Sequence, residues 1–466
     1  MKRKVITKHR TLLADSTTPV SIYLKLRDLY SGSVLLESSD FHHLENCFSY
    51  IGLEPIADFM ADEEQVLTRY DGEQGEARSL DSSEAIHQSL RKFMESFEFI
   101  ENDGHPNGFF GYMNFESVRF FEKLPESRHK PGGMIPSVRY HLYRFVISIN
   151  HFNDQLTITE NLFSGQKSQL EQVLFQIKNR PIVNYPFHTP GQEETNMKDE
   201  DYKDLVSRAK GHCQRGDVFQ LVLSRRFTRG FKGDEFNVYR ALRSINPSPY
   251  LFYFEFGDYR IMGSSPEMQI KTQGRQAIIN PIAGTFRRTG NDQEDKKLAA
   301  RLIEDEKENS EHVMLVDLAR NDLSKSTKDV KVIKNKEIQF YSHVLHIVST
   351  VSGNMDDARD GVQVLADTFP AGTLTGAPKI RAIELIDKYE PEKRNFYGGC
   401  IGYIGIDGSI NHAITIRSFL SRGNVLHYQA GAGITNQSDQ ENELAEVNNK
   451  LQALRDAIDQ AQAINM

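Results

Sequence analysis

A series of short apolar segments joined by glycine-containing turns constrains the fold of this chain most strongly. Turns such as Asp407-Gly408 and Arg422-Gly423-Asn424 are short enough to favour antiparallel pairing, because parallel strands need a long crossover. The predicted strands of the second half are Phe219–Phe227, Tyr250–Phe256, Ile278–Pro281, Gly402–Ile406 and Val425–Gly431. Strands are also predicted in the first half, at Val5–Thr7, Ser33–Glu37 and Arg139–Ile149.

Helical patterns occur in both halves. A helix is expected at Pro19–Leu29, with Thr18 as its cap and Pro19 in its first position. Three further helices are expected at Lys296–Leu323, Pro378–Lys388 and Ser438–Ala463. The mixture predicts an α+β fold in which two large, mostly antiparallel sheets pack face to face with the helices outside.

The length of the chain indicates more than one lobe. At 466 residues it is too long for a single ordinary core. A stretch rich in proline, glycine and charge lies around residues 185–201 and lacks apolar periodicity, which is typical of a linker or surface loop. We therefore expect an N-terminal region at 1–185, a linker at 186–200 and a second region at 201–466.

Composition and charge exclude several classes of protein. The formal net charge is -8 and basic residues cluster only at Met1–Arg10, which argues against nucleic acid as a partner. That N-terminus lacks the apolar run of a secretory signal, and no segment of about 18 apolar residues spans a membrane. Cys47, Cys213 and Cys400 are far apart, so neither a disulfide framework nor a cysteine-rich zinc site is expected. The prediction is a cytoplasmic protein.

Two predicted helices each carry a pair of glutamates three residues apart. The pairs are Glu308 with Glu311, and Glu443 with Glu446, where Ser438 and Glu441 have the spacing of a capping box at the helix start. Carboxylates that face one another across a site would need a cation, and Mg²⁺ suits such ligands. Paired glutamates are also common on solvated helix faces, so spacing alone leaves both interpretations open.

Three loops combine glycine with threonine. They are Asn280–Thr285, Gly372–Pro378 and Gln429–Thr435, which includes Gly431, Ala432 and Gly433. Clustered backbone amides and threonine hydroxyls can hold an anion, although each loop alone can equally be a tight turn. No phosphate-binding loop or dinucleotide fingerprint is present, so a carboxylate ligand fits these loops better than a phosphate.

Three isolated residues are candidates for chemistry. Arg417 alternates with apolar residues on a strand and could clamp a carboxylate with two hydrogen bonds, or form a structural ion pair. His346 could act as an acid or base near neutral pH, or be a satisfied core histidine. Glu267, at a strand end, could be a buried acid or a glutamate of a surface turn.

These pieces occur in an order that resembles the chorismate-utilising enzymes. The similar stretches are Gly-Ser-Ser-Pro-Glu267, Pro-Ile-Ala283-Gly-Thr285, Glu311-His-Val-Met-Leu-Val-Asp-Leu-Ala-Arg-Asn-Asp322, Gly-Thr-Leu-Thr-Gly-Ala-Pro-Lys379 and Gly431-Ala-Gly-Ile-Thr. Upstream, Leu35-Leu-Glu-Ser38-Ser-Asp and Phe48-Ser-Tyr-Ile-Gly are similar to the N-terminal region of the anthranilate synthase branch. The resemblance covers essentially the whole chain.

The resemblance implies a set of functional residues. Mg²⁺ would be bound directly by Glu311 and Glu446, with Glu308 and Glu443 supporting them. Chorismate would be held by Gly284, Thr285, Tyr397, Arg417 and the Gly431-Ala432-Gly433 stretch, with Thr373 alongside. Glu267 would protonate the departing C4 hydroxyl, and His346 would assist the later elimination of pyruvate.

Two positions separate the branches of this family. Relatives that form aminodeoxychorismate typically carry a nucleophilic lysine where this chain has Ala283, and isochorismate synthases carry a lysine base where it has Gln220. Because lysine is absent at both positions, the resemblance leaves ammonia as the nucleophile and implies anthranilate formation. The ammonia would be supplied by a separate glutamine amidotransferase subunit. An aminodeoxyisochorismate synthase and a catalytically silent regulatory subunit remain as alternatives.

The same branch carries a feedback site for L-tryptophan. It is formed by a Leu-Leu-Glu-Ser strand and an Asn-Pro-Ser-Pro-Tyr segment, and both are present here. By resemblance, the contacts to tryptophan would come from Glu37, Ser38, Pro249, Tyr250 and Leu251. A packing role for these two segments is the alternative.

Overall fold

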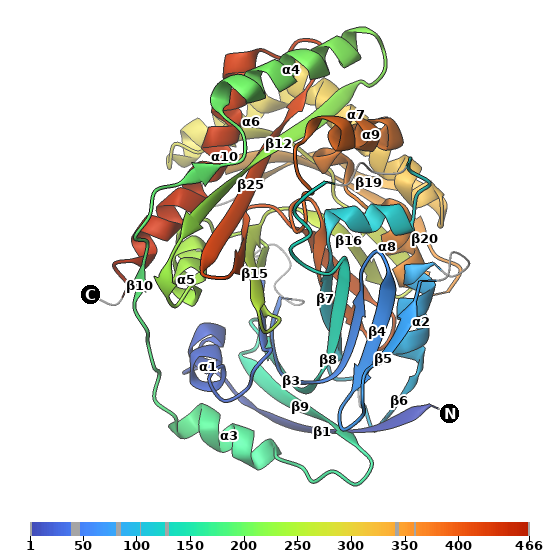
Figure 1. Ribbon diagram of the computed structural model, residues 1–466, viewed down its shortest axis with the longest axis vertical. Helices are drawn as coiled ribbons and strands as arrows, with labels where there is room; N and C mark the ends of the chain where they lie inside the picture. The colour runs from blue at the N-terminus through green and yellow to red at the C-terminus, as the bar shows by residue number, and fades with distance from the viewer. Residues whose placement is uncertain are drawn as a thin grey trace.

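The computed structural model describes residues 2–38, 47–80, 85–102, 104–125, 130–340, 344–357 and 360–464. Strands form the interior and most helices lie on the outside, as Figure 1 shows. The α+β class expected from the sequence is confirmed, and a large curled sheet of mostly antiparallel strands dominates the molecule.

The first part of the chain is mostly strand. Its elements are β1 (Arg3–Leu13), α1 (Pro19–Leu26), β2 (Val34–Glu37), β3 (Phe48–Ala61), β4 (Gln65–Tyr70), β5 (Glu76–Ser79), α2 (Ile86–Glu95), β6 (Phe97–Ile100), β7 (Gly108–Met113), the 3₁₀ helix η2 (Phe115–Phe120), β8 (Val138–Asn150), β9 (Gln155–Phe163) and α3 (Leu170–Asn179). Long antiparallel pairings of β3 with β8 and of β1 with β9 build the lower part of the molecule in Figure 1.

The second part alternates strands with longer helices. Its elements are β10 (Phe187–His188), β11 (Glu194–Thr195), α4 (Asp199–Gln214), β12 (Gln220–Gly230), β13 (Lys232–Gly233), α5 (Phe236–Ile245), β14 (Tyr250–Glu255), β15 (Tyr259–Ser265), β16 (Met268–Gln273), β17 (Gln276–Ile279), β18 (Ile282–Arg287), α6 (Asp292–Glu304), α7 (Glu306–Ser324), β19 (Lys328–Phe340), β20 (Val344–Asn354), α8 (Gly361–Thr368), the 3₁₀ helix η4 (Gly372–Leu374), β21 (Gly376–Ala377), α9 (Lys379–Tyr389), β22 (Cys400–Gly405), β23 (Ile410–Ile414), β24 (Ser418–Arg422), β25 (Val425–Ile434) and α10 (Gln440–Ala461).

Strands from both parts belong to the same hydrogen-bonded sheet. β2 pairs with β14, and β7 pairs with β22, both antiparallel. A cluster rich in aromatic side chains packs at these junctions, with Phe110 and Tyr112 from β7, and Phe252 and Phe254 from β14. The expected division into regions at residues 185 and 201 stays a prediction. The segment between them contains β10 and β11, which pair with β13 and β12.

The predicted strands are found in the structure with longer or shifted ends, but the strand expected at Ile278–Pro281 ends at Ile279, and Asn280 and Pro281 connect β17 to β18. The helix at Pro19 has the expected cap, because the Thr18 hydroxyl accepts a hydrogen bond from Ser21 N at 3.1 Å. The single helix expected at Lys296–Leu323 is wrong. It is interrupted at Asp305, whose extended backbone ends α6 and whose carboxylate accepts from Glu308 N at 3.0 Å to begin α7.

Two further helix starts differ from the predictions. Asp439, rather than Ser438, caps α10, since its carboxylate accepts from the backbone N–H groups of Glu441 and Asn442 at 3.0 and 3.1 Å. The Ser438 hydroxyl instead accepts from Thr435 N at 3.0 Å, in the turn before the helix. Pro378 is the N-cap residue of α9 rather than its first helical residue.

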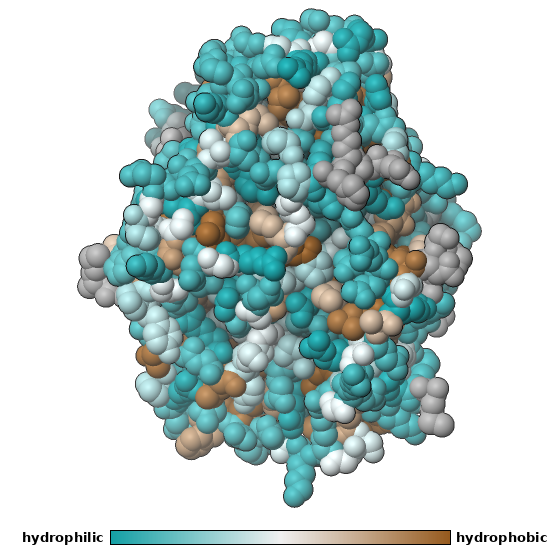
Figure 2. Space-filling view, in the orientation of Figure 1, coloured by the Kyte–Doolittle hydropathy of each residue, from teal (hydrophilic) through white to brown (hydrophobic). Residues whose placement is uncertain are grey.

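The surface gives two general findings. Among the described residues, no helix is long and apolar enough to cross a membrane. On the face shown in Figure 2, the described residues present a mostly hydrophilic surface on which hydrophobic side chains form small, scattered groups.

Candidate active site

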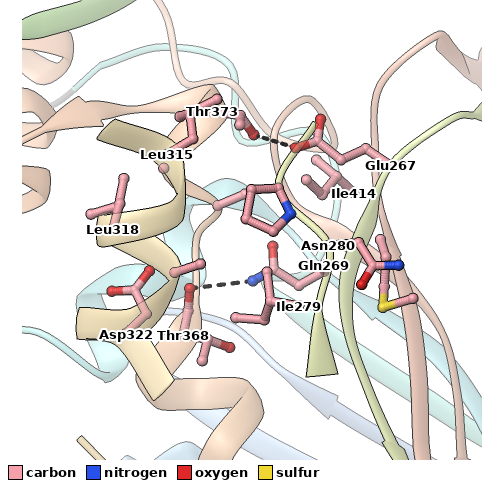
Figure 3. A pocket seen from close by; sticks show the side chains of 15 residues that line it. Glu267, Gln269, Ile279, Asn280, Leu315, Leu318, Asp322, Thr368, Thr373 and Ile414 are labelled. Atoms are coloured by element: carbon pink, nitrogen blue, oxygen red, sulfur yellow. Dashed lines mark hydrogen bonds between the residues drawn. The ribbon is translucent and has the colours of Figure 1, made fainter. Parts of the chain in front are cut away.

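Glu267 and Thr373 form the acid end of the candidate site. Glu267 follows β15, where Ile414 N donates to its backbone oxygen at 3.0 Å. The Thr373 hydroxyl, on η4, donates to Glu267 Oε1 at 2.8 Å, and Figure 3 shows the two side chains directed at one another. The structure thus brings together two predicted residues that are 106 positions apart.

The surroundings of Glu267 change its acidity. Burial raises the pKa of its carboxyl from 4.5 to about 7, although the hydrogen bond from Thr373 and the positive charge of Lys450 each act to lower it. A substantial fraction of this carboxyl is therefore protonated near neutral pH. That state is required of a group that donates a proton to a leaving hydroxyl.

His346 is held against the glycine loop of β18. Its Nδ1 donates to the backbone oxygen of Gly284 at 2.8 Å, so Nδ1 carries the proton and Nε2 is the basic nitrogen of the neutral ring. Burial, followed by the nearby charge of Arg417, lowers the pKa of His346, while the bond to Gly284 raises it. A neutral imidazole in this tautomer accepts protons at Nε2.

Gly284 is required by the local geometry. The pairing of β18 with β20 shifts by one residue between Ala283 and Thr285, and Gly284 has φ +68°. A Cβ at this position would lie 2.9 Å from Leu302 Cδ1 and 3.1 Å from Glu308 Oε2. The loop therefore presents its backbone directly to the carboxylate of Glu308. Thr285 pairs with His346 across the strands, and its side chain lies outside the described atoms.

Arg417 lies near both His346 and Tyr397. In the described part of the chain, the guanidinium of Arg417 makes no hydrogen bond or ion pair with another side chain, whereas its backbone oxygen accepts from Ser264 N at 3.1 Å. Burial lowers the pKa of Arg417, and the nearby Tyr397 raises it. Arg417 also has φ +49°, a conformation that costs energy in a residue with a side chain. A buried fork of donors held in this way suits a carboxylate ligand.

Tyr397 connects the acid end of the site to β25. With Leu374 and Ile414 it forms a small buried apolar cluster, against which Ala371 and Ile416 pack. Burial raises the pKa of its hydroxyl, while Arg394 and a backbone hydrogen bond from Gly431 lower it. Tyr397 consequently remains a neutral hydroxyl beside Gly431.

The Gly431-Ala432-Gly433 stretch of β25 lies against β12. A Cβ on Gly431 would lie 2.6 Å from the backbone oxygen of Leu223, and one on Gly433 would lie 2.5 Å from Gln220 Nε2. Ala432 is fully buried between them. Both glycines are thus required for close packing at the place where the side chain of Gln220 enters the site.

The four glutamates approach this region from two helices. Glu311 on α7 accepts from Gln220 Nε2 at 3.1 Å, and Glu308 adjoins Gly284. On α10, Glu446 pairs with Lys450 at 2.7 Å, and Glu443 is buried. Both Glu443 and Glu446 act to raise the pKa of Tyr202, whose raised value is caused first by burial. The two helices therefore direct their carboxylates toward neighbouring parts of β12 and β25.

The chemistry of these donors fits a divalent cation such as Mg²⁺, which prefers a few carboxylates and water. Among the residues that the structure describes, no group of three His, Cys, Asp or Glu side chains lies close enough together to hold a metal ion. Two of the four glutamates contact other side chains instead. Glu311 accepts a hydrogen bond from Gln220, and Glu446 forms an ion pair with Lys450.

The two segments expected to bind tryptophan are neighbours. Leu251 of β14 pairs with Glu37 of β2, and the Glu37 carboxylate accepts from the Tyr239 hydroxyl at 2.6 Å and from Arg243 Nε at 3.0 Å. Ser38 accepts from Cys47 Sγ at 3.3 Å through its backbone oxygen. Pro249 and Tyr250 lie at the start of β14, where Tyr250 pairs with Ser265 of β15.

Sequence reasoning missed several residues of the site. Lys450 donates to the backbone oxygen of Gly431 at 2.9 Å and pairs with Glu446, and its position four residues after Glu446 was a detectable signal. The bond from Gln220 to Glu311 had no such signal, because it joins a strand to a helix 91 residues away. Asp305, the cap of α7, was hidden inside a continuous helical pattern.

Comparison with known proteins gives consistent results. The family profile of chorismate binding enzymes matches residues 32–456. Anthranilate synthase component 1 of Aquifex aeolicus is 34% identical over 98% of this chain and 95% of its own length, and that of Thermus thermophilus is 36% identical over 97% and 98%. The crystal structure of anthranilate synthase component I from Streptococcus pneumoniae superimposes with a TM-score of 0.78 at 28% identity, covering 95% of this chain and 99% of that one.

Proposed function

The chain belongs to the family of chorismate binding enzymes, in the branch of anthranilate synthase component 1, and we propose that it converts chorismate and ammonia to anthranilate and pyruvate. One observation supports this proposal most directly. Glu267, a carboxyl whose pKa is raised to about 7, and the partly buried Arg417 belong to neighbouring segments, since Ile414 N donates to Glu267 O and Ser264 N donates to Arg417 O. The first step of this reaction needs an acid that protonates the leaving hydroxyl and a group that binds a carboxylate.

The nucleophile is inferred from the residues that stand nearby. Gln220 and Ala283, both buried, carry no amine or other base at the two positions where related branches use lysine. Ammonia therefore adds at C2 of chorismate, the ring double bonds shift, and the C4 hydroxyl leaves as water with the proton of Glu267. Thr373 holds the Glu267 carboxyl in position for this transfer.

Aromatisation requires a second proton transfer. The bond from His346 Nδ1 to Gly284 leaves Nε2 as the proton acceptor on a neutral ring. His346 takes up the C2 proton and passes it to the methylene carbon of the enolpyruvyl group, while the bond between ring C3 and oxygen breaks. Pyruvate is thereby released, the ring becomes aromatic, and His346 is neutral again. The lowered pKa of His346 suits a base rather than an acid at neutral pH.

We also propose that Mg²⁺ is the metal of this enzyme. Glu311 and Glu446 would bind it, with Glu308 and Glu443 supporting them, and it would neutralise the ring carboxylate of chorismate when bound. Arg417, Tyr397 and the Gly431–Gly433 backbone are the chain's own contributions to orienting the substrate. Support comes from the donor set and from the position of Glu308 against Gly284.

Partner and inhibitor are further parts of the proposal. A glutamine amidotransferase subunit would supply ammonia, as the name component 1 of the relatives suggests. L-Tryptophan would bind at Glu37, Ser38 and Pro249–Leu251 and favour a state that holds chorismate poorly. Asn246, at the start of this segment, accepts from the Ser264 hydroxyl, and Ser264 N in turn donates to Arg417 O. This short chain of contacts is a direct physical connection between the two sites.

The test uses the purified chain with chorismate, Mg²⁺ and ammonium. Anthranilate fluorescence and pyruvate should appear in equal amounts, disappear with EDTA, and fall on addition of L-tryptophan. His346→Asn retains a donor for Gly284 and removes the base, so it should consume chorismate without releasing pyruvate. Chorismate consumption without pyruvate by the wild type would indicate an aminodeoxyisochorismate synthase. A lack of consumption would indicate a silent regulatory subunit.

A further inference from the structure

A chamber lies next to Glu267, and neither Arg417 nor Tyr397 is among its described lining residues. The free space in and around it is about 390 Å³ when open solvent is included, and its walls come from β16, the β17–β18 connection, α7 and the loop around η4. Figure 3 shows Glu267 and Thr373 at one end and Asp322 and Thr368 at the other. Of the predicted site residues, only Glu267 and Thr373 belong to its described lining.

Two carbonyl oxygens in this chamber lack hydrogen-bond donors. Gln269 Oε1 and Asn280 Oδ1 are buried and, among the described residues, neither accepts a hydrogen bond. Gln269 is 2% exposed, and its Nε2 donates to the Thr368 backbone oxygen at 3.2 Å, as the dashed line in Figure 3 marks. The pairing of β16 with β23 shifts at Gln269, which directs its side chain into the chamber. Buried acceptors without donors are costly, so they indicate a ligand that donates.

The charges around the chamber favour a small cation. Its lining includes two carboxyl groups, Glu267 and Asp322. Lys379 compensates Asp322, since its Nζ contacts Asp322 Oδ2 at 2.6 Å and the Thr368 oxygen at 3.0 Å, and the positive charge of Lys450 also acts on Glu267. Ionised Glu267, Gln269 Oε1 and Asn280 Oδ1 therefore remain as three acceptors around one space. Ammonium, with four N–H donors and no acceptor, matches this set, whereas water would also present lone pairs to them.

We propose that this chamber binds ammonium next to Glu267, with Gln269 Oε1 and Asn280 Oδ1 as its acceptors, before nitrogen reaches the substrate. The inference rests on the proposed function, because it identifies where the nitrogen substrate of that reaction waits. It also assigns roles to Gln269 and Asn280 that neither motif nor spacing suggested.

The proposed position supplies the acid as well as the nucleophile. Ammonium gives one proton to ionised Glu267 and becomes ammonia. Ammonia forms the N–C2 bond, the ring double bonds shift, and the C4–O bond breaks as Glu267 returns the proton, so that the hydroxyl leaves as water. The nitrogen is bound as –NH₃⁺ and Glu267 is ionised again, which balances protons and charge without any further reactant.

Variants of Gln269 test the proposal kinetically with ammonium chloride as the nitrogen source. Gln269→Met keeps the length of the side chain and removes the acceptor, so the KM for ammonium should rise at least 10-fold while the KM for chorismate changes less than 2-fold. Gln269→Glu is the matched control, since it also loses the donor to Thr368 but retains an acceptor, and its ammonium KM should not rise. Asn280→Leu should repeat the effect of Gln269→Met, which protects the test against one poorly folded variant.

A crystallographic measurement is independent of turnover. Rubidium is close to ammonium in size, and crystals of the wild type in rubidium chloride should show an anomalous peak near Gln269 Oε1 that Gln269→Met lacks. An unchanged ammonium KM, an equal rise of both KM values, or a chamber that holds water only would overturn the proposal. A rubidium peak in a chain that forms no aminated product would instead refute the proposed function and leave the cation site standing.

Discussion

Glu267 is placed where its ionised form is poorly stabilised. The carboxyl is buried next to a hydroxyl donor, and burial dominates its raised pKa. An ordinary carboxyl would be fully ionised at neutral pH and unable to protonate a leaving hydroxyl. The same environment destabilises the folded chain once Glu267 ionises, so the proposed catalytic role and stability are opposed at this residue.

Glu267→Gln should therefore change the pH dependence of stability. The pKa of Glu267 is higher in the folded than in the unfolded chain, so wild type loses stability as pH rises from about 4.5 through about 7. Relative to wild type, the variant should gain about 1–2 kcal/mol between pH 5 and pH 8, after allowance for partial solvent contact. Urea unfolding at both pH values measures this, with Glu73→Gln at the exposed ion pair with Arg3 as the control. An equal difference at both pH values would contradict a raised pKa.

Arg417→Lys tests the carboxylate clamp. Lysine keeps the charge but loses the two-point fork, so the KM for chorismate should rise about 10- to 100-fold, the equivalent of about 1.5–3 kcal/mol for hydrogen bonds to a charged group. Arg422→Lys is the matched control, because Arg422 lies on β24 and pairs with Asp258 at the surface. Steady-state kinetics with varied chorismate would reject the clamp if both variants behaved alike.

At the scale of elements, α7 is the most consequential helix. It carries Glu308 and Glu311 at its beginning, where Asp305 caps it, and Asp322 at its end, where Lys379 of α9 contacts it. The Lys379–Asp322 pair is almost fully buried and also contacts the end of α8 through Thr368. The contact fixes α7 relative to the loop that bears Thr373.

Removing one partner of this ion pair should destabilise the chain more than replacing both partners with apolar residues. Lys379→Met alone leaves the buried Asp322 uncompensated and should destabilise the chain by about 3–5 kcal/mol, whereas Lys379→Met with Asp322→Leu should recover most of that loss. The first cooperative transition in urea measures both. Arg320→Met, which removes an exposed pair with Asp317 on the same helix, should change stability by less than about 0.5 kcal/mol. Additive effects of the two buried substitutions would show that the pair does not act as a unit.

At the scale of the whole molecule, the two halves of the chain complete one sheet. β14 obtains an edge partner from β2, and β22 obtains one from β7, at a junction packed with aromatic side chains. The segment around residue 193 is also held in place, because Glu193 accepts from Arg455 at 2.8 Å and from the Tyr428 hydroxyl. Regions defined by sequence composition therefore share a core.

Residues 201–466 expressed alone should not fold as an independent unit. Without the first half, β14 and β22 would present unpaired edges and the aromatic cluster would be exposed. Limited proteolysis and near-UV circular dichroism of this fragment should show a poorly ordered chain, and co-expression with residues 1–185 should restore resistance to protease. A stable, protease-resistant fragment would support two separate domains.

The sequence by itself determined the class of fold and supplied the candidate site residues. Local patterns sufficed for the strands and for the Thr18 cap, because capping and alternation depend on near neighbours. Motifs carrying Glu267, Thr373 and the β25 glycines supported the resemblance, which in turn implied roles for His346 and Arg417. The break at Asp305 was missed because α6 and α7 share one helical pattern.

Only the tertiary structure decided how these residues act. The raised pKa of Glu267, the tautomer of His346 and the bond from Gln220 to Glu311 all depend on contacts between segments distant in sequence. The chamber with Gln269 and Asn280 depends on a one-residue shift in strand pairing. The alternation of apolar and polar residues in the sequence does not reveal such a shift. Burial and hydrogen-bond geometry are properties of the packed chain. They determine the pKa of a carboxyl group and whether the oxygen of an amide has a hydrogen-bond donor.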